Sequence, residues 1–339
     1  MTRHDRAGSD LAVPLDQVDL SVEVAGAWFA TPVMTASGCA AAGRELAPFL
    51  DLASIGAVVT KSVLLDPRSG LPTPRMVETP SGMLNAIGLQ GPGIDVFLDR
   101  DLPWLVEQRA RVVVSIAGGS LGEYAELARR LGGSPGLTAV EVNISCPNVE
   151  DRGLVFACDP FQAGRAIAAA RRGVPRDIPV LAKLSPDVTD IVSVAEAVMD
   201  AGASGLSMVN TTLGLAVDAD TLRPTLGGLT GGLSGPAIRP LALRCVWQVH
   251  AAMPDVPIVG IGGIATGFDA LEFLAAGAAA VQVGTVIFHD PSAPARVADE
   301  LRVELARRGL TSPGEAVGVA HRPAGTPVRM PAPQQEASA

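Results

Sequence analysis

The sequence predicts an α/β fold, and within that class a (β/α)8 TIM barrel. Eight short apolar runs recur along the chain, helical stretches rich in Ala and Leu lie between most of them, and no break in composition divides the units. Alternating strands and helices are typical of a parallel sheet covered by helices. Eight such units is the number that closes a barrel. A doubly wound open sheet is the alternative, but the count and the even spacing favour the barrel.

The predicted strands are short and apolar, and the predicted helices are longer. The strands span residues 32–37, 57–62, 112–116, 139–145, 180–184, 205–210, 258–261 and 280–284. The helices include residues 123–131, 160–172, 190–201, 238–252 and 268–276. Two helices end in Ala-Gly-Ala, at residues 201–203 and 276–278, just before a strand. Glycine suits the end of a helix, where the chain must turn back.

Composition sets the bounds of the folded region. Hydrophobic residues make up 48% of the 339 residues, but aromatic residues only 4%, so Ala, Val, Leu and Ile must fill the core. Residues 1–18 are expected to form a disordered leader and residues 19–310 the barrel. Residues 311–339 are rich in Pro, Gly, Ala and Gln. Such a segment buries little apolar surface, so we expect a disordered tail there.

Charge and hydropathy argue against several classes of partner. The net charge is -9, and no basic stripe with interleaved aromatic residues is present, which argues against nucleic-acid binding. No apolar run reaches the length of about 18 residues that a membrane-spanning helix needs. Residues 1–10 have no apolar signal-peptide core. The four cysteines have the spacing of neither a zinc nor an iron–sulfur site. We therefore expect a cytoplasmic protein without a metal site.

Polar residues follow the predicted strands at their carboxyl ends, where barrels of this kind carry their active sites. Any one of them could be a turn residue, but two lysines at the ends of apolar strands are unusual without an anionic partner. The sequence therefore predicts a site for an anionic ligand at this end of the barrel. The set comprises Ser37, Lys61, Ser115, Asn143, Lys183, Asn210, Gly262, Gly263, Gly284 and Thr285.

Two glycine-rich segments favour a phosphate as part of that ligand. Residues 260–267 (Gly-Ile-Gly-Gly-Ile-Ala-Thr-Gly) follow the seventh strand and open a helix, and Gly284-Thr285 follows the eighth. Loops at these positions often bind phosphate through backbone N–H groups and a helix N-terminus. A plain tight turn is the alternative. The spacing is not that of a Rossmann motif.

Lysine and asparagine side chains indicate the rest of the ligand. A cation at Lys183 suits an electron-rich ring such as a flavin, unless Lys183 is simply a surface lysine. Side-chain amides have both donors and an acceptor, so several that converge could hold a planar imide ring. Lys61 could pair with a carboxylate on that ring. The four candidate amides are Asn85, Asn143, Asn148 and Asn210.

Cys146 follows the fourth strand and precedes Pro147, in a predicted active-site loop. Its thiol could be a nucleophile, a general base or a bystander. None of the four histidines lies in the neighbouring motifs, which disfavours a hydrolase with a Cys–His pair. A base that removes a carbon-bound proton while hydride leaves for a flavin needs no histidine. Cys39, Cys158 and Cys245 are expected to be inert core cysteines.

Seven short segments carry a resemblance to a known family. They are residues 60–62 (Thr-Lys-Ser), 85–90 (Asn-Ala-Ile-Gly-Leu-Gln), 143–149 (Asn-Ile-Ser-Cys-Pro-Asn-Val), 183–186 (Lys-Leu-Ser-Pro), 210–211 (Asn-Thr), 231–238 (Gly-Gly-Leu-Ser-Gly-Pro-Ala-Ile) and 262–264 (Gly-Gly-Ile). Over roughly residues 20–305 the chain resembles the class 1 dihydroorotate dehydrogenases. The resemblance implies a barrel with FMN at its mouth that oxidises dihydroorotate to orotate in pyrimidine (UMP) biosynthesis.

The resemblance also implies roles for individual residues. Cys146 matches the base that takes the C5 proton while the C6 hydride goes to FMN. The implied substrate contacts are Lys61, Asn85, Ala86, Ile87, Gly88, Leu89, Asn143, Asn148, Asn210 and Thr211. The implied FMN contacts are Ser37, Lys61, Ser62, Ser115, Asn143, Lys183, Val209, Gly235, Gly262, Gly263, Gly284 and Thr285.

The subclass follows from the same resemblance. Cys146 stands where the membrane-bound class has serine, and residues 231–240 look like the class 1B form. Such subunits pair with a subunit that carries FAD and an iron–sulfur cluster and passes electrons to NAD, so the assembly would be a homodimer core or a heterotetramer. Three residues depart from the family pattern. Ser115 stands in place of an asparagine that contacts the flavin, Gly91 in place of another asparagine, and Cys158 in place of a small residue.

Three alternatives stay open at this point. A dihydropyrimidine dehydrogenase-like FMN reductase shares two of the motifs, but its substrate has no carboxylate for Lys61. A class 1A-like homodimer would use fumarate as its acceptor. A barrel that binds a phosphorylated ligand without turnover is the alternative that is not an enzyme, and failure to take up FMN would favour it.

Overall fold

The computed structural model describes residues 11–144, 159–326 and 328. Its centre is an eight-stranded parallel sheet with the order β3-β14-β13-β10-β9-β8-β7-β4. All eight strands fall on the apolar runs predicted from the sequence. They are β3 (Val33–Thr35), β4 (Val58–Val59), β7 (Val112–Ile116), β8 (Leu137–Asn143), β9 (Val180–Leu184), β10 (Gly205–Met208), β13 (Ile258–Ile261) and β14 (Ala280–Val283).

The first and last strands of that order meet and close the sheet. The Thr35 N–H donates to the carbonyl of Ala57 (3.1 Å), and the Gly56 N–H donates to the carbonyl of Val33 (2.8 Å). The Thr35 hydroxyl also accepts a hydrogen bond from the N–H of Val59 (2.9 Å). These bonds satisfy backbone groups that an open edge would leave unpaired. The predicted (β/α)8 barrel is confirmed, and the open doubly wound sheet is excluded.

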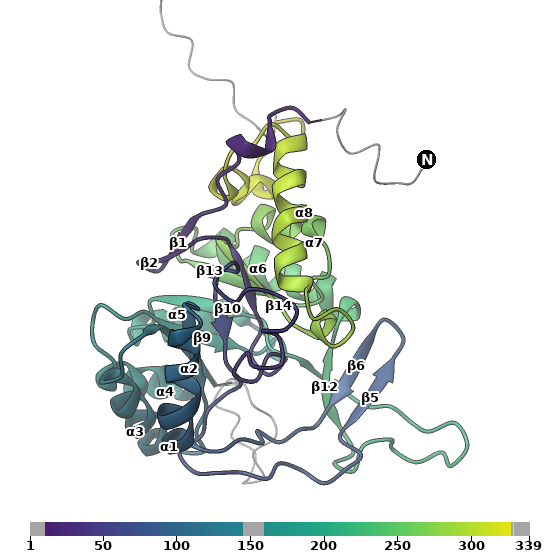
Figure 1. Cartoon of the computed structure of the whole chain (residues 1–339). Helices are drawn as coiled ribbons and strands as arrows, with labels where there is room; N and C mark the ends of the chain where they lie inside the picture. Colours follow the sequence, from purple (N-terminus) through teal and green to yellow (C-terminus); the bar gives the residue numbers. More distant parts are fainter. Residues whose placement is uncertain (1–10, 145–158, 327, 329–339) are drawn as a thin grey trace, which may run out of the picture.

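Helices cover the outside of the barrel (Figure 1). Side-chain caps at the first turn explain where several of them begin. Asp190, for example, accepts hydrogen bonds from the N–H groups of Val192 and Ser193, which have no partner inside the helix. The helices are α1 (Ile94–Val96), α2 (Leu102–Glu107), α3 (Leu121–Gly132), α4 (Pro160–Gly173), α5 (Ile191–Asp200), α6 (Arg239–Ala252), α7 (Gly267–Ala275) and α8 (Ala293–Arg307), with a π-helical segment, η3 (Phe97–Asp101), between α1 and α2.

The barrel interior changes character along its axis. Near the strand starts it is apolar, and the hairpin of β1 (Val22–Val24) and β2 (Ala27–Phe29) packs against it. Side chains alternate between the two faces of a strand, so residues two apart point to the same side. Glu141 therefore points to the same side of β8 as Ala139, and Lys183 to the same side of β9 as Leu181. The buried interior therefore becomes polar toward the carboxyl ends of the strands, where it includes Ser115, Glu141, Asn143, Lys183, Ser207 and Gln282.

A second sheet stands beside the mouth of the barrel. It is antiparallel, with the order β11-β12-β6-β5, and comprises β5 (Met76–Thr79), β6 (Gly82–Asn85), β11 (Thr212–Gly214) and β12 (Gly231–Ser234). In Figure 1, β5, β6 and β12 project away from the barrel. These strands were not predicted. Their one local signal is the turn at residues 80–82 (Pro-Ser-Gly), which joins β5 to β6.

Both ends of the described chain differ from the expectation of disorder. At the start, Val18 is buried, and the N–H groups of Ala12 and Val13 donate to the carbonyl of Ala306 on α8. Near the other end, η7 (Pro313–Ala316) and η8 (Val319–His321) pack on α7, and Ala316 is fully buried. Apolar residues inside these polar-looking segments explain the difference.

No helix among residues 11–144, 159–326 and 328 combines the length and apolar character needed to cross a bilayer.

Candidate active site

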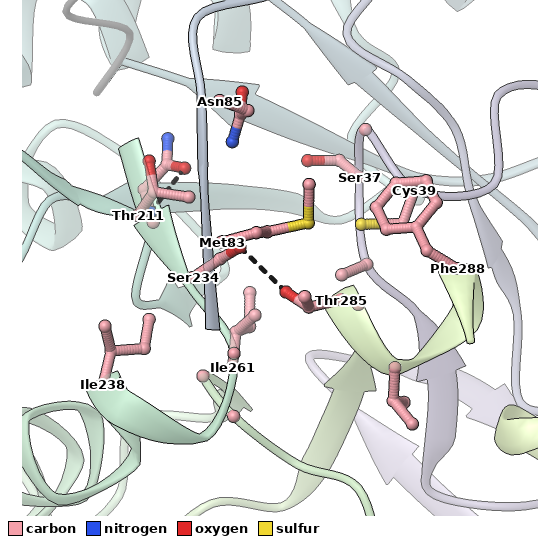
Figure 2. Close-up of a pocket in the computed structure, with 18 of the residues that line it drawn as sticks. Ser37, Cys39, Met83, Asn85, Thr211, Ser234, Ile238, Ile261, Thr285 and Phe288 are labelled. Atoms are coloured by element: carbon pink, nitrogen blue, oxygen red, sulfur yellow. Dashed lines mark hydrogen bonds between the residues drawn. The ribbon is translucent and has the colours of Figure 1, made fainter. Parts of the chain in front are cut away.

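A cavity of about 510 Å³ opens at the carboxyl ends of the barrel strands and under the antiparallel sheet (Figure 2). The barrel rule places ligands at this end. Most residues that the sequence predicts as site residues line it. They are Ser37, Lys61, Ser62, Asn85, Ile87, Gly88, Leu89, Asn143, Lys183, Val209, Asn210, Thr211, Gly235, Gly262, Gly263, Gly284 and Thr285.

Four predicted site residues are not among them, two of which the structure does not describe. Cys146 and Asn148 lie outside the described residues, so their placement stays a prediction. Ala86 is buried and packs with Leu84 and Leu226 under the antiparallel sheet. Ser115 is fully buried, one layer behind the cavity wall.

A chain of hydrogen bonds joins the polar groups of the wall. The Asn210 side-chain amide donates to the amide oxygen of Asn143 (3.2 Å), and the Asn143 amide donates to the hydroxyl of Ser62 (3.0 Å). The hydroxyls of Ser62 and Ser115 are 3.0 Å apart. Ser115 thus supports Ser62 from behind. Two of the predicted amides meet directly, although Asn143 ends β8 and Asn210 follows β10.

Asn85 reaches the cavity from the second sheet. It ends β6, and its side-chain amide donates to the carbonyl of Gly232 on β12 (3.3 Å). Ile87, Gly88 and Leu89 follow it along the wall. Asn85 therefore depends on pairing between segments that are 147 residues apart in the chain.

Two lysines bring positive charge to the cavity wall. Lys183 is the last residue but one of β9, and its ammonium donates to the hydroxyl of Ser37 (2.8 Å). Its side chain is only 4% exposed, which excludes the alternative of a surface lysine. Lys61 follows β4, and its backbone N–H donates to the carbonyl of Ala41 (2.9 Å). The predicted anionic site thus has two cations in its wall.

The position of Cys39 differs from the one expected from the sequence. It was expected to be a core cysteine, but it lies in the cavity wall (Figure 2). Burial raises the pKa of its thiol to about 11, although Lys183 and Lys61 act to lower it. The thiol therefore stays protonated at neutral pH, and the expectation that Cys39 is not a nucleophile agrees with that state.

Glycines let three loops meet closely at one end of the cavity. Gly263 has a φ of +70°, and a Cβ there would lie 2.7 Å from the carbonyl oxygen of Gly235. Gly235 has a φ of +94°, and a Cβ there would lie 2.8 Å from the Cα of Gly82. Beside them the Thr285 hydroxyl donates to that of Ser234 (2.9 Å), as Figure 2 shows. Side chains at the two glycines would block this close backbone packing.

Carboxylates take up part of the helix N-terminus expected at residues 260–267. Asp269 accepts hydrogen bonds from the N–H groups of Ala265 and Thr266, and Glu300 accepts one from Gly267. These carboxylates take up N–H groups at and just before the start of α7, whereas Gly262 and Gly263 still line the cavity. The first turn of η6 (Thr285–Phe288) lines the cavity as well. The first N–H groups of a helix have no partner within it, so η6 adds backbone donors beside this glycine-rich loop.

Several wall residues were missed by the sequence reasoning. Met76 and Met83 come from the β5–β6 hairpin, and Phe288 and His289 lie at the end of η6. The first pair could have been found from the turn between β5 and β6. The second pair carries no local signal, because it reaches the cavity only through the packing of η6.

Comparison with known proteins fits this architecture. The family model described as dihydroorotate dehydrogenase matches residues 19–305. The chain belongs to the dihydroorotate dehydrogenase family. It is therefore an oxidoreductase, and the family resemblance drawn from the seven motifs is confirmed.

Several similar proteins match about nine tenths of the chain. A protein of Geobacter sp. (strain M21), named dihydroorotate dehydrogenase B (NAD(+)), catalytic subunit, is 51% identical over 304 residues, which cover 90% of this chain and 99% of the relative. The protein of the same name from Geobacter sulfurreducens is also 51% identical, with the same coverage. The one from Desulforudis audaxviator is 48% identical over 91% of this chain and 100% of the relative.

Proposed function

We propose that this chain oxidises (S)-dihydroorotate to orotate with FMN as its cofactor, as a step of de novo pyrimidine (UMP) biosynthesis. Electrons would pass to a partner subunit and then to NAD. The observation that carries the proposal is one cavity that combines a close-packed glycine end, two lysines and a hydrogen-bonded chain of amides. Membership in the family supports the reaction class.

The described residues fit FMN at both of its ends. Gly235, Gly263 and the first turn of η6 would hold the phosphate, because they offer backbone N–H groups and space for close approach. Lys183 and Ser37 would hold the polar edge of the ring at the middle of the barrel mouth. Bound FMN would supply the hydride acceptor.

The remaining polar groups fit a small carboxylated imide. Lys61 would pair with the substrate carboxylate, and Asn85, Asn143 and Asn210 would hold the imide through their amides. Asn148 and Cys146 join this set by resemblance alone, since both lie outside the described residues. Cys146 would take the C5 proton of the bound ring, as a general base.

Electron transfer away from the chain is proposed from the names of the relatives. Those proteins are named as catalytic subunits of an NAD(+) enzyme. We infer a partner subunit with FAD and an iron–sulfur cluster, in an assembly built on a homodimer core or as a heterotetramer. We also infer a cytoplasmic location.

Anaerobic reduction of the flavin tests the reaction directly. The purified chain is loaded with FMN, and the oxidised flavin is mixed with dihydroorotate or dihydrouracil. In a separate experiment the flavin is first reduced and then mixed with fumarate. We expect bleaching by dihydroorotate, no bleaching by dihydrouracil, and no reoxidation by fumarate. Bleaching by dihydrouracil would support the dihydropyrimidine reductase instead, and reoxidation by fumarate would support the class 1A-like enzyme. A chain that never takes up FMN would contradict the proposal altogether.

A further inference from the structure

A fully buried carboxylate lies below the cavity and outside its wall. Glu141 sits in the middle of β8, between apolar neighbours, and its side chain is 0% exposed. It does not line the cavity. The sequence reasoning did not single it out, and the roles proposed above do not use it.

Glu141 connects to the cavity through one side chain. Its Oε1 lies 3.5 Å from the ammonium of Lys183, which is 4% exposed and does line the cavity. Its Oε2 accepts a hydrogen bond from the side-chain amide of Gln282 on β14 (2.9 Å). Within the described residues, Oε1 has no hydrogen-bond partner that would draw it away from the lysine. Gln282 thus fixes one oxygen, and the other is left beside Lys183.

A need for stability does not explain this buried ion pair. Branched aliphatic residues fill the interior of such barrels as a rule. Two buried charges lose their hydration, and a buried ion pair is often no more stable than apolar residues of similar volume. Buried charges with a specific charged partner, beside a cavity, are typical of functional sites. A functional reason for Glu141 is therefore the stronger explanation.

We propose that Glu141 is a positioning residue that anchors the Lys183 ammonium and partly offsets its charge, and thereby lowers the redox potential of the flavin. This inference rests on the proposed function, which places FMN in the cavity. Lys183 is held from two sides, by the Ser37 hydroxyl in the wall and by Glu141 below. A ligand in the cavity meets the cation directly and the carboxylate only through it.

The direction of the effect follows from charge. A positive charge beside a flavin stabilises its reduced anion. A carboxylate next to that cation weakens the stabilisation, so removal of the carboxylate should favour the reduced form. We expect Glu141→Gln to shift the ratio of reduced to oxidised flavin at a fixed potential about tenfold, which for a two-electron couple is about 30 mV upward.

The experiment measures the flavin potential of the FMN-loaded chain by equilibration with redox dyes and a chemical reductant. Asp101→Asn is the matched control. Asp101, like Glu141, is a buried carboxylate with cationic partners, here Arg44 and Arg100, but it lies in η3 and not in a barrel strand. We expect the control to leave the potential unchanged. A Glu141→Gln potential equal to or below that of the unmodified chain would overturn the proposal.

A double-mutant cycle tests whether Glu141 acts through Lys183. In a Lys183→Met background, Glu141→Gln should change neither the potential nor the FMN dissociation constant. An undiminished effect there would show that Glu141 acts by another route and would refute the positioning role. If Glu141→Gln alone does not fold, a difference in flavin potential between Lys183→Met and the double variant would still refute the positioning role, because Lys183→Met leaves no ammonium for Glu141 to act through.

Failure of this inference is distinguishable from failure of the proposed function. The dye measurement needs no dihydroorotate. A chain that binds FMN but is not reduced by dihydroorotate would refute the proposed function and leave the Glu141 test intact. A chain that is reduced normally, with no shift in Glu141→Gln, would refute only the role of Glu141.

Discussion

The two ends of the barrel interior are built from the same strands and yet have opposite chemistry. At the closed end, Ala139 and Leu181 pack with the β1–β2 hairpin in an apolar cluster. Two residues further along the same strands, Glu141 and Lys183 form a buried ion pair beneath the cavity. A step of two keeps a side chain on the same face, so only the residue type changes.

The difference separates stability from function within one fold. Apolar burial is the main favourable term in folding, and the closed end provides it. The open end carries the charges and amides that a ligand needs, and these cost stability when buried. Substitutions at the closed end should therefore change unfolding, and substitutions at the open end should change ligand chemistry.

The largest expected effect concerns the open end. Cys146→Ala should keep FMN but slow its reduction by dihydroorotate by about 10²–10⁴-fold, the usual loss for a general base. Stopped-flow absorbance of the loaded chain measures the rate. Cys245→Ala is the matched control, since Cys245 is buried in α6 and does not line the cavity. Equal rates for Cys146→Ala and the unmodified chain would remove Cys146 from the mechanism.

At the closed end, Phe29→Ala should lower the free energy of unfolding by about 3–5 kcal/mol, because it opens a cavity where a fully packed ring was. Phe29 is 2% exposed and closes the bottom of the barrel. Denaturant titration measures the loss. Phe161→Ala serves as the control, since Phe161 is 69% exposed. A change in the FMN affinity of the folded Phe29→Ala variant would break the separation of the two ends.

The same comparison explains what could be predicted from the sequence. Strands and strand-end residues were predictable, because apolar runs mark each strand and the barrel rule gathers their carboxyl ends. Lys183, Asn143 and Asn210 were found in this way. Their hydrogen-bond order was not, since it depends on side-chain geometry between strands β8 and β10.

What escaped prediction depends on contacts between distant segments. The antiparallel sheet pairs β6 with β12, and no local pattern reveals that partnership. Glu141 and Gln282 had a local signal, as polar residues inside apolar strands, but the pair forms only when β8 and β14 face each other across the barrel. Glu300 accepts its hydrogen bond from Gly267 at the start of α7 for the same kind of reason, since the two residues are 33 positions apart.

A smaller effect is expected at the glycine end of the cavity. Gly263→Ala should weaken FMN binding about tenfold, or about 1.4 kcal/mol, because the new Cβ would crowd the Gly235 carbonyl in a backbone conformation that favours glycine. Fluorescence titration with FMN and with riboflavin locates the loss. A phosphate site predicts a loss for FMN and little for riboflavin. Gly133→Ala, where a Cβ meets open space, is the control. Equal losses for both flavins would argue that the glycine end does not hold the phosphate.

The smallest effect lies outside both ends, where η8 packs on α6. Burial, and next the neighbouring His321, lowers the pKa of His250 below its ordinary 6.5. Below that ordinary value the unfolded chain binds a proton that the folded chain does not, so stability falls as the pH falls from about 6.5 toward the lowered value. His250→Gln should reduce this loss. Thermal unfolding of both proteins at pH 7.5 and pH 5.5, about one unit either side of that value, measures it. If His250→Gln leaves the pH dependence of stability unchanged, the loss of stability at low pH belongs to other groups. If the FMN affinity depends on pH and His250→Gln removes that dependence, the contact between His250 and His321 also affects the cavity.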